Sequence, residues 1–424
     1  MCLLATYPLG YASVAPLLAA LLDGLFEQPK GKSSDQEEPL VELAIPRFVA
    51  IDSSVLASWA KDAFASDSKL RASARDVQSP LLDANWIPIV CLHHFMELAR
   101  YPDLEVAGKR ITFLKSFSQI AWLGRSYGSK ILGSIVDLFE AEVGAILTCP
   151  DVDFTGMRRS VREKLVQYGA PSEIELLNDW AYLHPILRAM AIREQEIASI
   201  MHAKHSAHDD TEIARLKKIR PIGQTALNRP VPAKVEKLAK DLSDHGDSRL
   251  VDPYRTAQDF LKMVSSHLVD ASKVEGTAYD VFVASLDVPQ SDISDGTTLR
   301  QITQIARRRK LARVAVNQLG MDFDQVWPKL RDTKIPSEIV QETIRKARKS
   351  APRGSGSDIG DDYLACLAPY VDAIIVDKRT HEFMTQGARR DPYFRKMVGF
   401  FEKATSYRQL PEILARHPGG GQPK

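Results

Sequence analysis

Cysteine is scarce in this chain, and its four residues, Cys2, Cys91, Cys149 and Cys366, lie far apart along 424 positions. No two of them form a CxxC pair, so their spacing excludes the usual cysteine zinc sites. Cys91 and Cys366 lie inside apolar runs, which is typical of small buried side chains. The pattern favours a reducing, cytoplasmic location over a disulfide-stapled secreted protein.

Long apolar runs are also missing from the sequence. The most apolar stretch, residues 17–26, is interrupted by Asp23. It is far shorter than the roughly 20 residues that cross a bilayer. The first basic residue, Lys30, follows this stretch instead of preceding it, which argues against a secretory signal. We therefore expect no membrane partner.

Neither sign of charge predominates, since 56 Lys and Arg residues stand against 54 Asp and Glu residues, for a net charge of +2. Affinity for nucleic acid would therefore have to come from local basic patches. The sequence also lacks a phosphate-binding loop, a nucleophile elbow and a dinucleotide fingerprint. Its hydrophobic share of 44% indicates a folded protein, and its length allows two or three domains.

The chain begins with a short helical region and then changes to an α/β pattern. Residues 1–45 hold an amphipathic helical pattern at 16–26 and a linker rich in Pro, Gly, Ser and charge. Across 46–123, apolar strand-like runs alternate with helical runs, which predicts a parallel sheet covered by helices on both faces. The three strand-like runs are 47–52, 85–92 and 119–123.

Helical periodicity then fills residues 124–351 almost without strand signals, which predicts a separate all-α body. The α/β pattern returns at 352–416, with a strand over 371–377 and a helix over 394–403. The Gly- and Pro-rich segment 417–424 is predicted to be a disordered tail. The predicted fold class is thus α/β, with a parallel sheet flanked by helices and interrupted by a large all-α insertion.

Acidic residues occur where the strands of such a sheet would end. They close predicted strands or lie in the first turns of adjacent helices, at Asp52, Glu97, Asp358, Asp361, Asp362 and Asp377. Each one alone is explained as a turn or helix-cap residue. In a parallel sheet, however, the strands share one carboxyl edge, where ligands bind. Carboxylates gathered there would repel one another unless a cation such as Mg²⁺ or Mn²⁺ neutralised them.

The order of these segments resembles that of the PIN-domain nucleases. Asp52 closes an apolar strand, and Glu97 lies on a helix. The segment 357–366 reads SDIGDDYLAC, and 373–377 reads AIIVD. The resemblance implies a compact α/β domain whose four acids hold Mg²⁺ or Mn²⁺ and hydrolyse phosphodiester bonds, usually in RNA.

The resemblance covers residues 46–123 and 354–414, about a third of the chain. On this basis 46–123 and 352–416 are the two parts of a split PIN-like domain, with 124–351 as its insertion. The acids that match the family in chain order are Asp52, Glu97, Asp361 and Asp377. Asp358 and Asp362 stay open as the third acid, because the family rarely has further aspartates there.

The function implied by the resemblance is a metal-dependent endonuclease that leaves 5′-phosphate and 3′-hydroxyl ends, most often in single-stranded RNA. One alternative is a catalytically weak or inactive scaffold that binds RNA or protein through its helical body. Another is a structure-specific DNA nuclease. An inhibitory protein partner, or a second copy of the chain, is compatible with each of these hypotheses.

Basic residues beside the last acids are candidate contacts for a nucleic-acid backbone. They are Lys346, Arg348, Lys349, Arg353, Lys378 and Arg379. A second basic run, 307–310, is more typical of a solvated helix face.

Histidines offer weaker candidates. His93 or His94 could order a water or contact a phosphate, although a polar helix start is the simpler interpretation. The run formed by His202, His205 and His208 has metal-like spacing, yet on a helix the third histidine rotates off the face that the first two share. We interpret this run as a solvated helix end.

Overall fold

The structure is a computed structural model, and it describes residues 46–125, 128–202, 213–218, 232–271, 277–294, 296–348 and 358–417. The chain divides into two compact units. We call the first the sheet unit, with described residues 46–125, 128–188, 334–348 and 360–417, and the second the helical unit, described within 189–333 and at 358–359. The predicted N-terminal helix and the tail beyond His417 lie outside the described residues.

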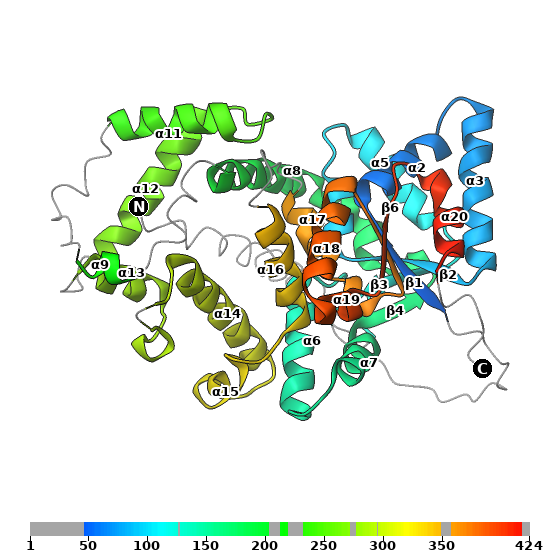
Figure 1. The fold of residues 1–424 in the computed structure, drawn as a ribbon. Helices are drawn as coiled ribbons and strands as arrows, with labels where there is room; N and C mark the ends of the chain where they lie inside the picture. The colour runs from blue at the N-terminus through cyan, green and yellow to red at the C-terminus, as the bar shows by residue number, and fades with distance from the viewer. Residues whose placement is uncertain are drawn as a thin grey trace. The chain divides into compact units, whose positions relative to one another are not determined.

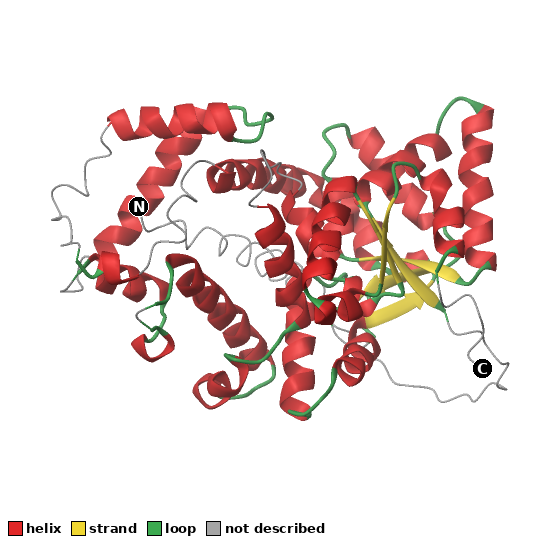
Figure 2. Cartoon of the chain, viewed as in Figure 1, coloured by secondary structure: helices red, strands yellow, loops and turns green. Residues whose placement is uncertain are grey.

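The sheet unit contains a six-stranded, mostly parallel sheet, drawn in yellow in Figure 2. Its strands are β1 (Arg47–Ile51), β2 (Trp86–Val90), β3 (Ile120–Leu123), β4 (Val166–Gly169), β5 (Ala373–Val376) and β6 (Phe400–Lys403). Their order is β4-β3-β2-β1-β5-β6, and only the β3–β4 pair is antiparallel. Every residue of β2, β3 and β5 is buried, as expected for strands covered on both faces.

Helices connect and cover these strands, as Figure 1 shows. Before the helical unit they are α2 (Ser53–Ala63), α3 (Ser68–Asp83), α4 (Leu92–Ala99), α5 (Leu104–Lys115), α6 (Ile135–Thr148) and α7 (Phe154–Leu165). After it they are α16 (Pro336–Arg348), α17 (Asp358–Ala365), α18 (Lys378–Arg390), α19 (Pro392–Val398) and α20 (Leu410–Ala415). The long helix α8 (Glu175–His202) starts in the sheet unit and ends in the helical unit.

The core of the sheet unit joins the two ends of the described sequence. The indole ring of Trp59 is fully buried and stacks on the ring of Tyr407, with 5.4 Å between centroids. It also packs against Phe113 and Phe117, and its Nε1 donates to the Ala74 carbonyl at 2.9 Å. Aromatic side chains from α2, α5 and the C-terminal segment therefore bury one another, which stabilises a domain assembled from distant parts of the chain.

Two apolar clusters lie in the described part of the helical unit. Its further helices are α9 (Ile213–Leu216), α11 (Pro232–His245), α12 (Pro253–Ala271), α13 (Ala278–Leu286), α14 (Leu299–Gln318) and α15 (Phe323–Leu330). One cluster joins the end of α8 to α11 and α12, and the other joins α9 and α13 to α14. None of the helices in the described segments has both the length and the hydropathy that a membrane crossing requires.

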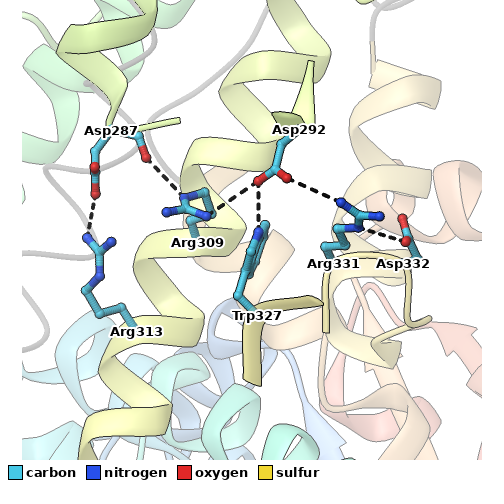
Figure 3. A network of polar contacts seen from close by, with 7 residues as sticks. All are labelled: Asp287, Asp292, Arg309, Arg313, Trp327, Arg331 and Asp332. Atoms are coloured by element: carbon cyan, nitrogen blue, oxygen red, sulfur yellow. Dashed lines mark hydrogen bonds and ion pairs between the residues drawn. The ribbon is translucent and has the colours of Figure 1, made fainter. Parts of the chain in front are cut away.

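A polar network within the helical unit is centred on Asp292 (Figure 3). Its Oδ2 accepts hydrogen bonds from Trp327 Nε1 at 2.8 Å and from Arg309 Nη1 at 3.4 Å, and Arg331 reaches Oδ1 at 3.5 Å. Arg309 is only 8% exposed, and its guanidinium lies over the Trp327 ring. The solvated face predicted for the run 307–310 is therefore wrong at Arg309, which packs and pairs inside the unit.

Three elements differ from the sequence-based expectation. Strand β4 lies inside the segment predicted to be all-α, and residues 128–188 and 334–348 belong to the sheet unit. The helix predicted over 394–403 ends at Val398, because Gly399 adopts a φ of 60° and turns the chain into β6. His417, the first residue of the predicted disordered tail, is ordered instead: its Nε2 lies 3.0 Å from the Asp372 carbonyl oxygen.

Candidate metal centre at the carboxyl edge of the sheet

The middle of the sheet is a topological switch point. From β1 the chain proceeds to β2 and then to β3 on one side, whereas β5 leads to β6 on the other. Helices α2, α3 and α5 cover one face, and α17 and α18 lie on the opposite face (Figure 1). Connections that leave neighbouring parallel strands toward opposite faces open a crevice at the carboxyl ends of those strands. In this sheet the switch point lies between the ends of β1 and β5.

Asp52 is the first residue after β1, at this switch point. Its backbone N–H donates to the Ile375 carbonyl of β5 at 2.8 Å. Its Oδ1 accepts hydrogen bonds from the Ser54 amide at 2.7 Å and from the Ser54 hydroxyl, so Asp52 caps α2. The side chain is 4% exposed, and burial raises the pKa of its carboxyl, with a smaller contribution from the charge of Asp377.

Asp377 holds the equivalent position after β5. Its Oδ1 accepts from the Thr380 amide at 2.7 Å and its Oδ2 from the Arg379 amide at 3.3 Å, which makes it the cap of α18. The ordinary helix-cap interpretation therefore applies to both strand-end aspartates. Capping does not explain why the two aspartates are adjacent. They are adjacent because β1 and β5 pair directly, with Ile51 opposite Ile375.

Glu97 and Asp361 come from two helices that touch each other. A Cβ atom at Gly360, the residue before Asp361, would collide with the Glu97 carboxylate, so glycine allows this close approach. Beside this contact the ring of His93 stacks on the ring of Tyr363, with 4.5 Å between centroids. Helix α4 thus holds Glu97 against the first turn of α17.

The electrostatics of Asp361 indicate that the charges of three other acids reach it. Its pKa is raised well above the usual value, first by burial and then by the negative charges of Glu97, Asp52 and Asp377, with Asp362 contributing least. Such mutual repulsion requires carboxylates that are close in space, although they come from four separate segments. Within the described residues, however, no three His, Cys, Asp or Glu side chains are already placed to hold one metal ion.

Two arginines pair with acids in this region. Arg348 binds Asp362 through two hydrogen bonds, with Nη1 at 2.9 Å from Oδ2 and Nη2 in contact with Oδ1. Arg100 lies 3.6 Å from Glu97 Oε1. Because Arg348 already engages both carboxylate oxygens of Asp362, whereas Arg100 reaches one oxygen of Glu97, Asp362 fits the role of a metal ligand less well than Asp361 or Glu97. Asp358 is the first residue of α17, and its side chain is not among those described.

The six basic residues predicted to contact nucleic acid have different surroundings. Lys346 and Lys378 are exposed, and Lys346 also lies 3.6 Å from Glu342. Arg348 and Arg379 are less accessible and place their guanidinium groups over the ring of Phe383. The remaining two, Lys349 and Arg353, lie outside the described residues.

The two histidines at the start of α4 agree with the expected polar helix start in one respect and differ in their burial. His94 Nδ1 accepts from the Cys91 amide at 3.1 Å and so caps the helix, but His93 and His94 are only 8% and 1% exposed. Burial lowers the pKa of His93 to about 3 and that of His94 to about 4, and both rings are therefore neutral near pH 7. His202 ends α8, whereas His205 and His208 lie outside the described residues.

Two residues near the site escaped the sequence analysis. Ser54 orients Asp52 through its amide and hydroxyl, and a serine two residues after a strand-end aspartate is a recognisable capping signal. Gly360 has no Cβ, which leaves room for the Glu97 carboxylate. In the sequence, the only signal for this contact is a glycine between aspartates at a helix start.

Comparison with known proteins adds no further likeness. No family model matches the chain, and no curated protein or solved structure matches it either.

Proposed function

We propose that this chain is a metal-dependent endonuclease of PIN-like fold that hydrolyses single-stranded RNA and leaves 5′-phosphate and 3′-hydroxyl ends. One observation carries the proposal: Asp52 and Asp377 follow the paired strands β1 and β5, and Glu97 lies against Gly360, next to Asp361, at the switch point of a parallel sheet. Helix capping accounts for Asp52 and Asp377 individually. Helix capping does not account for the presence of Glu97 and Asp361 beside them.

The residues present fit Mg²⁺ or Mn²⁺. Carboxylate oxygens are the donors that hard divalent cations prefer. Besides burial, the negative charges of Glu97, Asp52 and Asp377 raise the pKa of Asp361, and a bound cation would oppose that part of the effect. Asp52, Glu97, Asp361 and Asp377 would hold the metal, directly or through water, and we expect their side chains to reorient on binding. When bound, the metal would acidify a water molecule and neutralise charge on the phosphate.

The protein's own groups would supply orientation and substrate attraction. Ser54 holds the Asp52 carboxylate through two hydrogen bonds, and the first turn of α18 holds that of Asp377. The exposed Lys378, next to Asp377, is placed to attract a substrate phosphate. In the hydrolysis, a water oxygen bonds to phosphorus, the bond to the 3′ oxygen breaks, and that oxygen takes up a proton.

The first test is cleavage of fluorescent single-stranded RNA by the purified chain with Mg²⁺ or Mn²⁺, beside a DNA strand of the same sequence. Asp52→Asn should lose at least 100-fold in rate, whereas Asp103→Asn should retain it. Asp103 is a matched control because it caps α5 in the same way, through the Glu105 and Val106 amides, and asparagine is an equally good cap. Equal losses in the two variants would assign the effect to folding and contradict the proposal.

The second test measures metal binding without activity. In chelator, Asp361→Asn should raise the melting temperature, because it removes a charge that its neighbours repel. Added Mn²⁺ should then stabilise the wild type more than the variant, since a ligand that binds only the folded state shifts its stability. Equal Mn²⁺ shifts would mean that the metal binds elsewhere.

One observation favours the inactive-scaffold alternative, namely that the described residues contain no preformed three-ligand group. RNA binding by the wild type without cleavage in either metal would support that alternative. Faster cleavage of the DNA strand would instead identify a DNA nuclease.

A further inference from the structure

His94 connects three elements at the carboxyl edge of the sheet. It lies in the first turn of α4, three residues before Glu97, and is 1% exposed. Its Nδ1 is 3.1 Å from the Cys91 amide nitrogen and 3.2 Å from Cys91 Sγ. Its Nε2 is 3.0 Å from the carbonyl oxygen of Ile51, the residue before Asp52.

These contacts define one tautomer. A backbone N–H can only donate, so Nδ1 must accept from the Cys91 amide and carries no proton. The proton of the neutral ring therefore lies on Nε2, which donates it to the Ile51 carbonyl. Burial also lowers the pKa of His94 to about 4, so this state persists across the physiological range.

The hydrogen bond to Ile51 extends the connection between two strands beyond their last paired residues. The β1–β2 register ends at Ala50 opposite Ile89, one residue before Ile51. The imidazole then links the end of β1 to Cys91, directly after β2, and to the helix that carries Glu97. One rigid ring thus spans the distance between the backbone next to Asp52 and the helix of Glu97.

We propose that His94 is a positioning residue that sets the separation between Asp52 and Glu97 in the candidate metal centre, an inference that rests on the proposed nuclease function. Groups behind metal ligands that fix the orientation of those ligands change metal affinity by about 10- to 100-fold when removed. His94 acts on both acids through the backbone and touches neither the metal nor the substrate.

The adjacent His93 provides an internal control for the exchange measurement at Asp52. It is almost equally buried, but its ring stacks on Tyr363 and makes none of the contacts to β1. Its Nε2 has no hydrogen-bond partner within the described part of the chain. A substitution at His93 therefore removes a buried imidazole of the same size from the same helix and leaves the connection to Ile51 intact.

The test compares His94→Asn, His94→Gln and His93→Asn. Glutamine places an amide N–H close to where Nε2–H lies and can keep the bond to Ile51, whereas asparagine reaches only as far as Nδ1. Calorimetric titration with Mn²⁺ should show affinity weakened by at least about 10-fold in His94→Asn and by less than about 3-fold in His94→Gln. Amide hydrogen exchange, measured without metal, should be at least about 10-fold faster at Asp52 in His94→Asn alone.

The outcomes separate this inference from the proposed function. A wild type that binds no Mn²⁺ overturns the proposed function and the role of His94 in it. A wild type that binds Mn²⁺, with equal losses of affinity in His94→Asn and His94→Gln or equally fast exchange at Asp52 in His94→Asn and His93→Asn, overturns the positioning role only. If His94→Asn fails to fold, His94→Gln decides, because a loss of 10-fold or more in Mn²⁺ affinity despite a retained donor contradicts the inference.

Discussion

At the scale of single residues, buried carboxyl groups are held in two ways in the sheet unit. Asp361 shares its surroundings with three other acids, and their charges raise its pKa. Glu142, on α6, has no exposed surface and is surrounded by donors instead: the Ser337 amide at 2.9 Å, the Ser337 hydroxyl, and the Tyr370 hydroxyl at 2.5 Å. Only Asp361 and its neighbours would be stabilised by a cation, because the oxygens of Glu142 already accept hydrogen bonds.

Glu142 predicts a pH dependence of stability. Burial raises its pKa from 4.5 to about 7, despite hydrogen bonds that lower it. Between these values the folded state binds a proton that the unfolded state has lost, so this group's contribution to stability falls as pH rises, by up to about 3 kcal/mol. Glu142→Gln keeps the size and cannot titrate. Urea unfolding at pH 5 and pH 8 should therefore show a smaller pH difference than in the wild type.

The exposed Glu163 on α7 serves as the control for this comparison. Glu163→Gln should leave the difference between pH 5 and pH 8 unchanged. A Glu142→Gln variant with the same pH difference as the wild type would show that Glu142 is ionised in the folded protein at both values.

At the scale of elements, α17 is the short helix on which the candidate site depends. Three contacts hold it in the sheet unit: Glu97 against Gly360, His93 against Tyr363, and Arg348 with Asp362. Two of these contacts come from α4 and one from the end of α16. Asp361 is therefore positioned by tertiary contacts on both sides, which a helix of eight residues needs because it is not stable alone.

The end of α16 predicts different roles for two neighbouring cations. Arg348 is 16% exposed and engages Asp362, whereas Lys346 is 65% exposed. With RNA binding measured in chelator at several salt concentrations, Lys346→Met should reduce the slope of log affinity against log salt by about one. Arg348→Met should instead lower the melting temperature, because Asp362 loses its partner beside other acids, and should change the slope little. Identical effects of the two variants would contradict this division.

At the scale of the whole molecule, the sheet is assembled from parts of the chain on both sides of the helical unit. Strands β1 and β5 pair directly, and Asp372, just before β5, strengthens that junction. Its Oδ2 accepts from the Phe48 amide at 2.9 Å, and both Arg158 and Arg162 of α7 bind its carboxylate. One half-buried carboxylate thus ties together β1, β5 and a helix from the segment between them.

Asp372→Ala should therefore destabilise the sheet unit strongly. The change leaves two half-buried arginines and a backbone N–H without this acceptor, which typically costs about 2–4 kcal/mol. Chemical denaturation should show a lower midpoint with an unchanged slope, as expected when only stability changes. The exposed Asp332, at the end of the helical unit, provides the control, and Asp332→Ala should shift the midpoint little. Similar shifts in both variants would contradict a special role for Asp372.

Much of the sheet could be predicted from the sequence, and the reason is burial. β1, β2, β3 and β5 are short apolar runs next to helical patterns, and they occupy the centre or the covered part of the sheet. The missed strands, β4 and β6, are its edges and are only partly buried. An edge strand carries polar residues such as those of the run VQYG, so its pattern does not distinguish it from a loop.

The sequence by itself determined which acids follow strands and begin helices, because apolar runs and capping residues are local signals. That Asp52 and Asp377 become neighbours was decided by strand order, since only pairing between distant segments places β5 beside β1. The tertiary structure also decided which basic side chains pair with an acid, as Arg348 does, and that His93 and His94 are buried. Burial and charge pairing depend on what packs around a side chain, and the surrounding groups come from other parts of the chain.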